Sequence, residues 1–276
     1  MQRNENRRER KNEKSWRNKE GSKTEIKIGT WNVRGLNQVG AMKQLISEIR
    51  KQKFEIVALQ ETKQKESVMM EIEKYAFLNS GGDNRVLGTG FLVSPEIKSL
   101  IMKFKPVSDR LCYLRIRGKF QNISLINIHA PTEEADLESK EAFYEKLQKE
   151  YDEIPRYDLK IVLGDANAKI GKEEIYKQAI GKHSKHDKTS DNGQMLVDFA
   201  MEKNMRIKST CFKKKEIHKG TWRAPNGDYT NQIDHVLVER EDERNITDIR
   251  SYRGIDIDSD HFMVGIKVRQ TIPEKK

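Results

Sequence analysis

Residues 160–167, KIVLGDAN, join an apolar run directly to two polar side chains. The run 161–163 has the short apolar character of a buried strand, and Asp165 and Asn167 follow it after Gly164. Polar groups at strand ends meet at one rim of a sheet, which is where open α/β folds bind their ligands. This stretch therefore predicts a sheet with a polar site at one rim.

Five further clusters repeat this placement of polar residues at or beside strand-like apolar runs. They are Thr30-Trp31-Asn32, Gln60-Glu61-Thr62, His129-Ala130-Pro131, Gln232-Ile233-Asp234-His235 and Ser259-Asp260-His261. The first three end the apolar runs 26–28, 56–59 and 123–128. Any one cluster alone is explained as well by a turn or a helix cap. Their joint occurrence favours one shared active site.

The segments around these clusters alternate between strand and helix patterns. Short apolar or alternating runs predict strands at 25–32, 55–60, 90–94, 111–117, 122–129 and 160–164. Apolar residues at helical spacing predict helices at 41–52, 66–75 and 138–151, and Asp191-Asn192-Gly193 is expected to cap a helix at 194–203. A turn at 225–228 should join strands that end near Trp222 and begin near Gln232. An α/β sandwich of mixed sheets with flanking helices fits this alternation.

Composition indicates a soluble globular protein. The 276 residues suit one layered domain, and no Pro- or Gly-rich linker divides them. No apolar run approaches the length of a membrane span, and charged residues occupy the N-terminal stretch where a signal peptide is apolar. Cys112 and Cys211 match neither a disulfide framework nor a zinc-ligand spacing, so reduced thiols and an intracellular location, nuclear or cytoplasmic, are expected.

The formal net charge of +10 is unevenly distributed. Residues 1–23 hold nine Lys or Arg and four Glu with almost no apolar side chains, which predicts a disordered basic arm. A polyanionic partner would use this arm, although a merely solvated tail explains the composition as well. The expected organisation is this arm, one catalytic domain at 24–270 and a short tail at 271–276.

The polar residues of the first clusters suit metal-assisted phosphodiester hydrolysis. Asp165 is the expected general base for an attacking water, and Asn167, two residues later, supplies an amide that can orient water or phosphate. Glu61 is the expected ligand of a hard cation, Mg²⁺ with Mn²⁺ as an alternative, and Asn32 orients it. No set of soft ligands competes in the sequence, because His183, His186 and Asp187 lie in a lysine-rich loop that is unlike a zinc site.

The last clusters supply the phosphate contacts. His261 can donate to the phosphate if a carboxylate favours its cationic form, and Asp234 is the candidate for that task. Asp260 is expected to help hold metal-bound waters. Trp222-Arg223, with Thr221 before them, can stack on or wedge into DNA near the predicted turn, although packing of the tryptophan in the core is an equal alternative.

These ordered motifs resemble the endonuclease/exonuclease/phosphatase superfamily over about residues 25–268. The resemblance implies a four-layered α/β sandwich with two central sheets flanked by helices, and Mg²⁺-dependent phosphoester hydrolysis. The stretches 33–36, 130–132, 192–194 and 221–234 look most like the apurinic-type endonuclease of RTE-clade non-LTR retrotransposons, a group with standalone proteins called craniofacial development protein 2-like. That implies an enzyme that nicks DNA, with His129 as a further phosphate contact.

Two residues depart from the patterns of these relatives. Arg34 stands where abasic-site repair enzymes carry an aspartate on the metal side, which argues against a repair role. His129 stands where many retrotransposon and repair enzymes have tyrosine, a swap that keeps a phosphate contact but can change its pH dependence.

Three functions are compatible with the sequence. A DNA-nicking endonuclease explains all six clusters and the basic charge. A phosphoesterase for lipid or small-molecule phosphates explains the clusters but gives the basic arm no use. A domesticated, non-catalytic nucleic-acid-binding protein explains only the charge. The sequence leaves the oligomeric state and the cleavage preference open.

Overall fold

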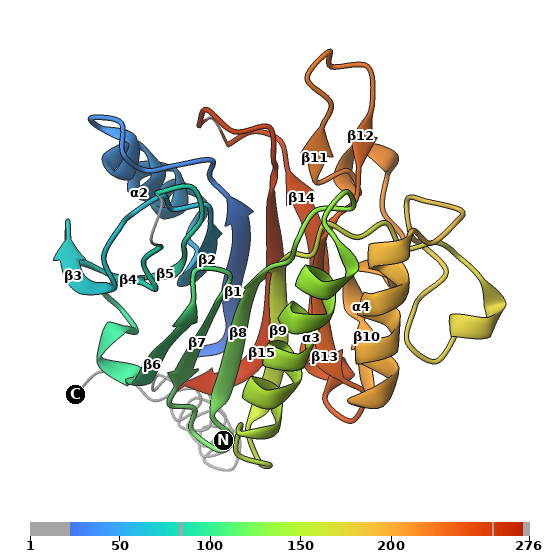
Figure 1. Ribbon diagram of the computed structural model, residues 1–276. Coiled ribbons are helices and arrows are strands. Elements are labelled where there is room, and N and C mark those ends of the chain that lie inside the picture. The colour runs from blue at the N-terminus through green and yellow to red at the C-terminus, as the bar shows by residue number, and fades with distance from the viewer. Residues whose placement is uncertain (1–22, 83–84, 256, 273–276) are drawn as a thin grey trace, which may run out of the picture.

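The computed structural model describes residues 23–82, 85–255 and 257–272. A seven-stranded mixed sheet has the order β14-β15-β1-β2-β5-β4-β3 (Figure 1). Its strands are β1 (Lys23–Asn32), β2 (Ile56–Gln60), β3 (Val68–Ile72), β4 (Tyr75–Asn79), β5 (Thr89–Val93), β14 (Ile246–Tyr252) and β15 (Met263–Ile272). Strands β1 and β2 are parallel, and the other pairs of this sheet are antiparallel.

A six-stranded mixed sheet has the order β10-β13-β9-β8-β7-β6. Its strands are β6 (Ile101–Ser108), β7 (Leu111–Ile116), β8 (Ile123–His129), β9 (Leu159–Asp165), β10 (Met205–Ile207) and β13 (Asp234–Glu239). Here β8 and β9 form the parallel pair. A separate ribbon of β11 (Trp222–Arg223) and β12 (Thr230–Asn231) projects from the body near α4 (Figure 1).

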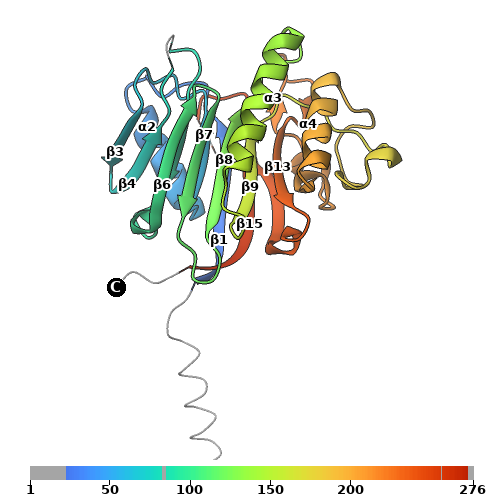
Figure 2. The same ribbon diagram turned by 60° about the horizontal axis from the view of Figure 1, so that its bottom comes forward.

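The two sheets pack face to face, and helices cover their outer faces (Figure 2). Apolar side chains of both sheets, such as Ile28, Phe91 and Leu163, form one buried cluster between them. Helix α2 (Ala41–Gln52) buries Leu45, Ile46 and Ile49 in a second cluster on the outer face of the seven-stranded sheet. Helices α3 (Leu137–Asp152) and α4 (Asp191–Glu202) cover the six-stranded sheet. The predicted four-layered α/β sandwich is confirmed.

Short 3₁₀ turns complete the described elements, at Lys98–Leu100, Glu174–Tyr176, Lys208–Thr210, Glu216–His218 and Glu243–Asn245. Within the described ranges, no helix combines the length and the apolar character that a bilayer crossing requires.

The helix predicted at 66–75 is wrong, because this segment forms the hairpin β3–β4. Glu73 and Lys74 make its turn with positive φ values of 47° and 75°. Two-residue hairpin turns of this kind normally carry Asn or Gly, so the sequence gives no turn signal here. Since the strand side chains on the exposed edge include Met69 and Met70, the apolar pattern also lacks the alternation of a half-buried strand.

Several boundaries differ from the expected ones. Helix α4 begins at Asp191 rather than Gln194, and its N-cap is Ser190, whose hydroxyl accepts the Gly193 N–H at 3.2 Å. Strand β15 extends to Ile272, beyond the expected domain end, and β1 begins at Lys23, the last residue of the expected arm. Residues 1–22 of that arm and 273–276 of the expected tail lie outside the described residues.

Candidate active site

The register of the six-stranded sheet places three polar residues side by side at one rim. Asp165 ends β9 and pairs in register with His129 at the end of the parallel β8. On its other side it pairs with Asp234 at the start of the antiparallel β13. Gly164 makes this close packing possible, because a Cβ there would overlap the Ile128 backbone carbonyl and its φ is 150°.

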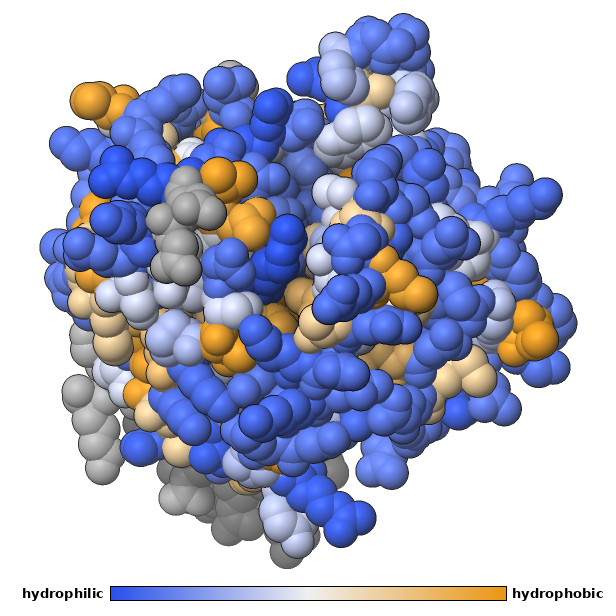
Figure 3. All heavy atoms as spheres, viewed as in Figure 1, coloured by the Kyte–Doolittle hydropathy of each residue, from blue (hydrophilic) through white to orange (hydrophobic). Residues whose placement is uncertain are grey.

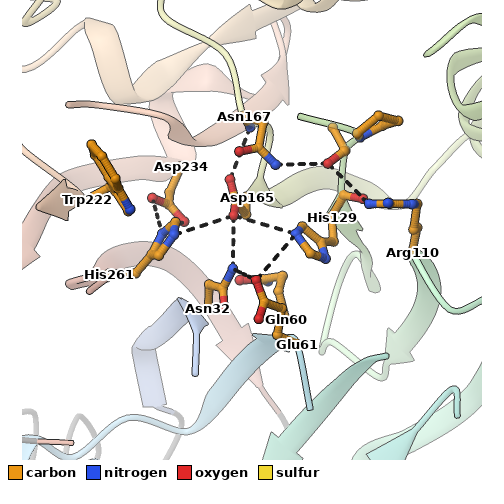
Figure 4. A network of polar contacts seen from close by, with 12 residues as sticks. Asn32, Gln60, Glu61, Arg110, His129, Asp165, Asn167, Trp222, Asp234 and His261 are labelled. Carbon is orange, nitrogen blue, oxygen red and sulfur yellow. Dashed lines mark hydrogen bonds and ion pairs between the residues drawn. The ribbon is translucent and has the colours of Figure 1, made fainter. Parts of the chain in front are cut away.

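The rim of the seven-stranded sheet brings Asn32 and Glu61 to the same place (Figure 4). Asn32 ends β1 and pairs with Gln60 of the parallel β2, so Glu61 follows directly. The Asn32 amide nitrogen donates to Glu61 Oε1 and to Asp165 Oδ2, each at 3.0 Å. Its oxygen accepts the Arg34 backbone N–H at 3.1 Å, so every contact agrees with one orientation of the amide. Asn32 therefore connects the two rims.

Glu61 combines partial exposure with an ionised carboxylate. Burial acts to raise its pKa, but the hydrogen bond from Asn32 and the charges of His129 and Lys63 outweigh burial, so the pKa of Glu61 lies below its usual value. Lys63 Nζ lies 3.4 Å from Glu61 Oε2. Glu61 also has a left-handed backbone with φ 49°, a conformation that aims its side chain at the rim at some cost in strain.

Asp165 lies in the opposite environment. It is 1% exposed, and burial raises the pKa of its carboxyl group, with the negative charge of Asp234 adding to the rise. His261 Nε2 lies 3.7 Å from Asp165 Oδ2 and partly offsets both effects. The backbone N–H of Asn167 donates to Asp165 Oδ1 at 3.0 Å. A carboxylate with a raised pKa binds a proton strongly, which suits a general base.

His261 and Asp234 form a buried pair. His261 Nδ1 lies 3.1 Å from Asp234 Oδ2 and 3.3 Å from Oδ1. Burial acts to lower the pKa of His261, but the carboxylates of Asp234, Asp165 and Asp260 outweigh it and raise the pKa to about 9. At neutral pH His261 is therefore a cation whose Nε2 points towards Asp165 (Figure 4).

His129 closes the site on the side opposite Asp234 (Figure 4). Its Nε2 lies 3.8 Å from Asp165 Oδ2 and 3.9 Å from Glu61 Oε1. Burial lowers the pKa of His129, although both carboxylates act against this effect. Arg110, which the sequence did not single out, donates from Nη1 to the His129 carbonyl at 3.2 Å. It stands directly before β7 without any motif that would mark it.

Asn167 uses its amide inside the protein. Its Nδ2 donates to the Ala130 carbonyl at 2.9 Å, and its own carbonyl accepts Asn192 Nδ2 at 3.0 Å. Asn192 also donates to the Pro131 carbonyl at 3.0 Å. The first turn of α4 thus holds the loops after β8 and β9 together, a role that the expected helix cap at this residue does not convey.

Asp260 lies beside the hairpin, and none of its described contacts reaches Glu61. Its Oδ2 accepts Trp222 Nε1 at 3.0 Å, and its Oδ1 lies 3.6 Å from Arg34 Nε. Trp222 is half-buried and meets Tyr229 edge-on, with 6.1 Å between ring centroids. The predicted metal-side role of Asp260 stays a prediction.

Thr221 supports Asp234 from inside the protein. It is 2% exposed, and its hydroxyl accepts the backbone N–H groups of Ile233 at 3.0 Å and Asp234 at 3.1 Å. This burial favours a positioning role over the predicted direct contact with DNA. Arg223, by contrast, has an exposed side chain on the projecting ribbon.

A buried polar network joins the two sheets directly beneath the site. Gln60 Nε2 donates to Thr30 Oγ1 at 2.9 Å and to Asn127 Oδ1 at 2.6 Å. Asn127 in turn donates to the backbone carbonyls of Leu59 and Gly90 at 2.9 and 2.8 Å. The network ties the strand that carries Glu61 to the strand that carries His129. Asn127 sits inside an apolar run, so only its polarity there hinted at this role.

Two groups of residues fit a divalent ion. Asp165, Asp234 and His261 have ligand atoms within 4.8 Å of one another and could hold a metal ion. The raised pKa of His261 argues for a proton in that group instead, because a protonated imidazole cannot ligate. Glu61, ionised and partly open, with an amide beside it, offers the hard oxygen ligand that Mg²⁺ prefers. The donor chemistry therefore fits a metal at Glu61.

The loop histidines are not part of this site. His186 Nε2 accepts the Gln232 backbone N–H at 3.1 Å, and burial with nearby positive charges lowers the pKa of His186 to about 4. Asp187 instead pairs with Lys172 at 2.7 Å. Among the described residues, His183, His186 and Asp187 do not group as metal ligands, in line with the expectation.

Known proteins share this sequence pattern and this fold. Residues 29–261 match the sequence model of the Endonuclease/Exonuclease/phosphatase family. Craniofacial development protein 2 of Bos taurus is 27% identical over 248 residues, which are 90% of this chain and 41% of that protein. The chain thus spans about two fifths of the length of this curated relative.

Solved structures add the fold. The endonuclease domain of TRAS1, a telomere-specific non-LTR retrotransposon, has a TM-score of 0.63 at 15% identity, covering 89% of this chain and 98% of that domain. The 3′ phosphatase NExo from Neisseria, bound to a product DNA hairpin, has a TM-score of 0.65 at 19% identity, covering 88% and 99%. The family match over most of the chain and the convergent site agree, and the chain belongs to the Endonuclease/Exonuclease/phosphatase family.

Proposed function

We propose that the protein is a Mg²⁺-dependent DNA endonuclease that nicks one strand of its target by hydrolysing a phosphodiester, with Mn²⁺ able to replace Mg²⁺. The observation that carries the proposal is the convergence of Glu61, Asp165 and His261 around the Asn32 amide. The formal net charge of +10 favours a polyanionic substrate. Structures of similar fold include a retrotransposon endonuclease domain and an enzyme bound to DNA.

The residues of the buried half can carry the proton transfers. Asp165 accepts a proton from a water whose oxygen attacks phosphorus, while the bond from phosphorus to the leaving oxygen breaks. His261, held cationic by Asp234, donates a hydrogen bond to a phosphate oxygen as negative charge develops there. His129 lies on the other side of Asp165, where it can contact a second phosphate oxygen.

Glu61 and Asn32 would hold the metal, which supplies positive charge at the leaving oxygen when it is bound. The side chain of Glu61 is 24% exposed, so a cation can reach it from solvent. Asn32 keeps the carboxylate in place with its amide nitrogen and shares the same nitrogen with Asp165. The distance between metal side and base side is thereby set by one side chain.

The projecting ribbon offers contacts for DNA beyond the cleaved bond. Trp222 and Arg223 start the ribbon, and Tyr229 is 55% exposed near its tip. An aromatic pair with an arginine suits stacking and backbone contact. The face seen in Figure 3 is mainly hydrophilic with scattered apolar residues, so this face lacks the broad apolar patch that a lipid-surface enzyme would use.

Nicking of supercoiled plasmid tests the proposal. With Mg²⁺ the protein should convert supercoiled to open-circular DNA, and excess EDTA should stop the conversion. Glu61→Gln removes the carboxylate ligand with little change in shape, so the rate should fall more than about 100-fold. Glu145→Gln, on the exposed face of α3, makes the same chemical change away from the site and should leave the rate unaltered. Undiminished nicking in EDTA would refute the proposal.

The same assay separates the alternatives. A lipid or small-molecule phosphoesterase would release phosphate from those substrates and leave the plasmid intact. A non-catalytic binder would retard the plasmid in a gel without nicking it. We also propose an intracellular location, nuclear or cytoplasmic, on the basis of the two free cysteines and the DNA substrate.

A further inference from the structure

Asp260 links the two sides of the site mouth. Its Oδ2 accepts Trp222 Nε1 at 3.0 Å, its Oδ1 lies 3.6 Å from Arg34 Nε, and its backbone carbonyl accepts the Arg223 N–H at 2.9 Å. Through these contacts one carboxylate positions both the start of the projecting ribbon and the loop after β1.

Arg34 stands at the edge of a cavity beside Glu61. The cavity has a volume of about 310 Å³ and is lined by Arg34, Lys63, Val33, Leu36, Asn37 and Asp258, among others. The Arg34 backbone is left-handed, with φ 52°, and its N–H donates to Asn32. Its side chain is 54% exposed, so the guanidinium is open to a ligand although Asp260 holds it.

The walls of this cavity are fixed by hydrogen bonds. The Leu36 N–H donates to the Thr62 carbonyl at 3.1 Å, and Asn37 Nδ2 donates to the Lys63 carbonyl at 2.9 Å. Gln64 Nε2 donates to Asn37 Oδ1 at 2.6 Å. The loops after β1 and β2 therefore move as one unit, and the cations of Arg34 and Lys63 sit on a preformed surface.

We propose that Arg34 binds a phosphate of the DNA strand in this cavity, next to the cleaved bond, and that Asp260 positions Arg34 and Trp222 instead of ligating the metal. The proposal rests on the proposed function. A guanidinium presents several N–H donors in one plane and matches a phosphate, and Nε alone faces Asp260.

The contacts of Asp260 explain why it suits this positioning role. One carboxylate oxygen is occupied by the Trp222 indole, and the other is a buried atom without a hydrogen-bond partner in the described chain, facing the guanidinium. A divalent ion at that oxygen would meet the positive charge of Arg34, whereas Glu61 lies on the far side of Asn32 from this repulsion only through its own partner Lys63. A phosphate, being anionic, gains from Arg34 and Lys63 together.

Two binding measurements test the proposal without any turnover. Mn²⁺ affinity is measured by electron paramagnetic resonance, and affinity for a DNA duplex is measured by fluorescence anisotropy in EDTA at several salt concentrations. The variants are Asp260→Asn, Arg34→Ala and Arg34→Lys. Arg117→Ala is the matched control, because it removes an exposed arginine just after the opposite end of β7 from Arg110. Thermal melting shows that each variant is folded.

Asp260→Asn should leave Mn²⁺ affinity within about 3-fold of the wild type and weaken DNA binding about 10-fold. Arg34→Ala should weaken DNA binding by a similar factor and reduce the salt slope by about one, whereas Arg34→Lys should keep the slope and lose part of the affinity. Arg117→Ala should alter neither quantity by more than the loss of one distant charge.

A fall in Mn²⁺ affinity of more than about 10-fold in Asp260→Asn would overturn the proposal, because it would make Asp260 a metal ligand. Equal DNA affinities for Arg34→Ala and Arg117→Ala would overturn it as well. In both cases a wild type that still binds and nicks DNA leaves the proposed function standing. A wild type that binds Mn²⁺ but neither binds nor nicks DNA would remove the proposed function and this inference together.

Discussion

Glu61 and Asp165 are two carboxylates that share one hydrogen-bond donor, yet their surroundings act on them in opposite ways. Asn32 Nδ2 lies 3.0 Å from each. The pKa of Glu61 is lowered, because its hydrogen bond and the nearby cations outweigh burial, and the pKa of Asp165 is raised, because burial and Asp234 outweigh the histidines. Chemically similar groups a few ångströms apart thus become a cation ligand and a base.

The difference arises from the two sheets. Glu61 follows β2 on a left-handed residue at an open rim, with Lys63 beside it. Asp165 ends the central β9, with His129 and Asp234 in register on its two sides. Position within a sheet, rather than residue type, separates the metal side from the proton side.

Replacing the base should give the largest effect. Asp165→Asn keeps the shape of the side chain but cannot accept a proton, so nicking at saturating protein should fall by about four orders of magnitude. The measurement is single-turnover conversion of supercoiled plasmid. Mn²⁺ affinity should stay unchanged if the metal belongs to Glu61.

Asp198→Asn, an exposed aspartate on α4, is the matched control and should retain full activity. A loss of Mn²⁺ affinity in Asp165→Asn would erase the distinction between the two carboxylates. It would place the metal in the group of Asp165, Asp234 and His261.

Changes in the Asp234–His261 pair should be large but not additive. Asp234→Asn or His261→Ala should each lower turnover by about two to four orders of magnitude, and the double variant should be little worse than either one. The reason is that Asp234 acts through His261, from which it is 3.1 Å away. A double defect equal to the product of the single defects would show that the residues work separately.

The pair also sets the pH dependence on the alkaline side. If His261 donates as a cation, activity falls as pH rises through its pKa of about 9. The Asp234 carboxylate raises that pKa, so Asp234→Asn should move the alkaline limb of the pH–rate profile to lower pH. An unmoved limb would mean that another group controls it.

The smallest effects are expected in stability, with opposite pH trends for the two carboxylates. The folded pKa of Glu61 is lowered, so its contribution to stability is present above its unfolded pKa and is lost as pH falls through the folded pKa. The folded pKa of Asp165 is raised, so its contribution is present below the unfolded pKa and is lost as pH rises through the folded pKa.

Melting temperatures of wild type, Glu61→Gln and Asp165→Asn in metal-free buffer check these signs. Between about pH 6 and about pH 4, the wild-type advantage over Glu61→Gln should shrink as pH falls, by about 2 °C or less. Relative to Asp165→Asn, the wild type should instead gain as pH falls. Parallel trends for both variants would contradict the separation of the two environments.

Much of the fold could be predicted from the sequence because its signals are local. Helix α2 was expected at its observed bounds, since Leu45, Ile46 and Ile49 recur at helical spacing and are buried. The hairpin β3–β4 could not be recognised, because its turn at Glu73-Lys74 carries no Asn or Gly and its edge strand exposes its methionines. The strands β14 and β15 were not singled out either, and it is β15 that completes the sheet around β1.

The sequence by itself determined which residues are available at the rim. Asn32, Glu61, His129 and Asp165 each stand at the end of an apolar strand, and the spacing of such residues along the chain is a local property. The membership of the site was therefore predictable from strand-end positions alone.

Only the tertiary structure decided what each residue can do. The bridging of Glu61 and Asp165 by Asn32, the support of Arg110 and Asn192, and the pairing of Asp260 with Trp222 and Arg34 all join residues that are distant in the chain. A pKa depends on burial and on charges within a few ångströms, and both are fixed by sheet register and packing of the two sheets. Sequence spacing carries neither quantity, which is why the opposite characters of Glu61 and Asp165 emerged only in three dimensions.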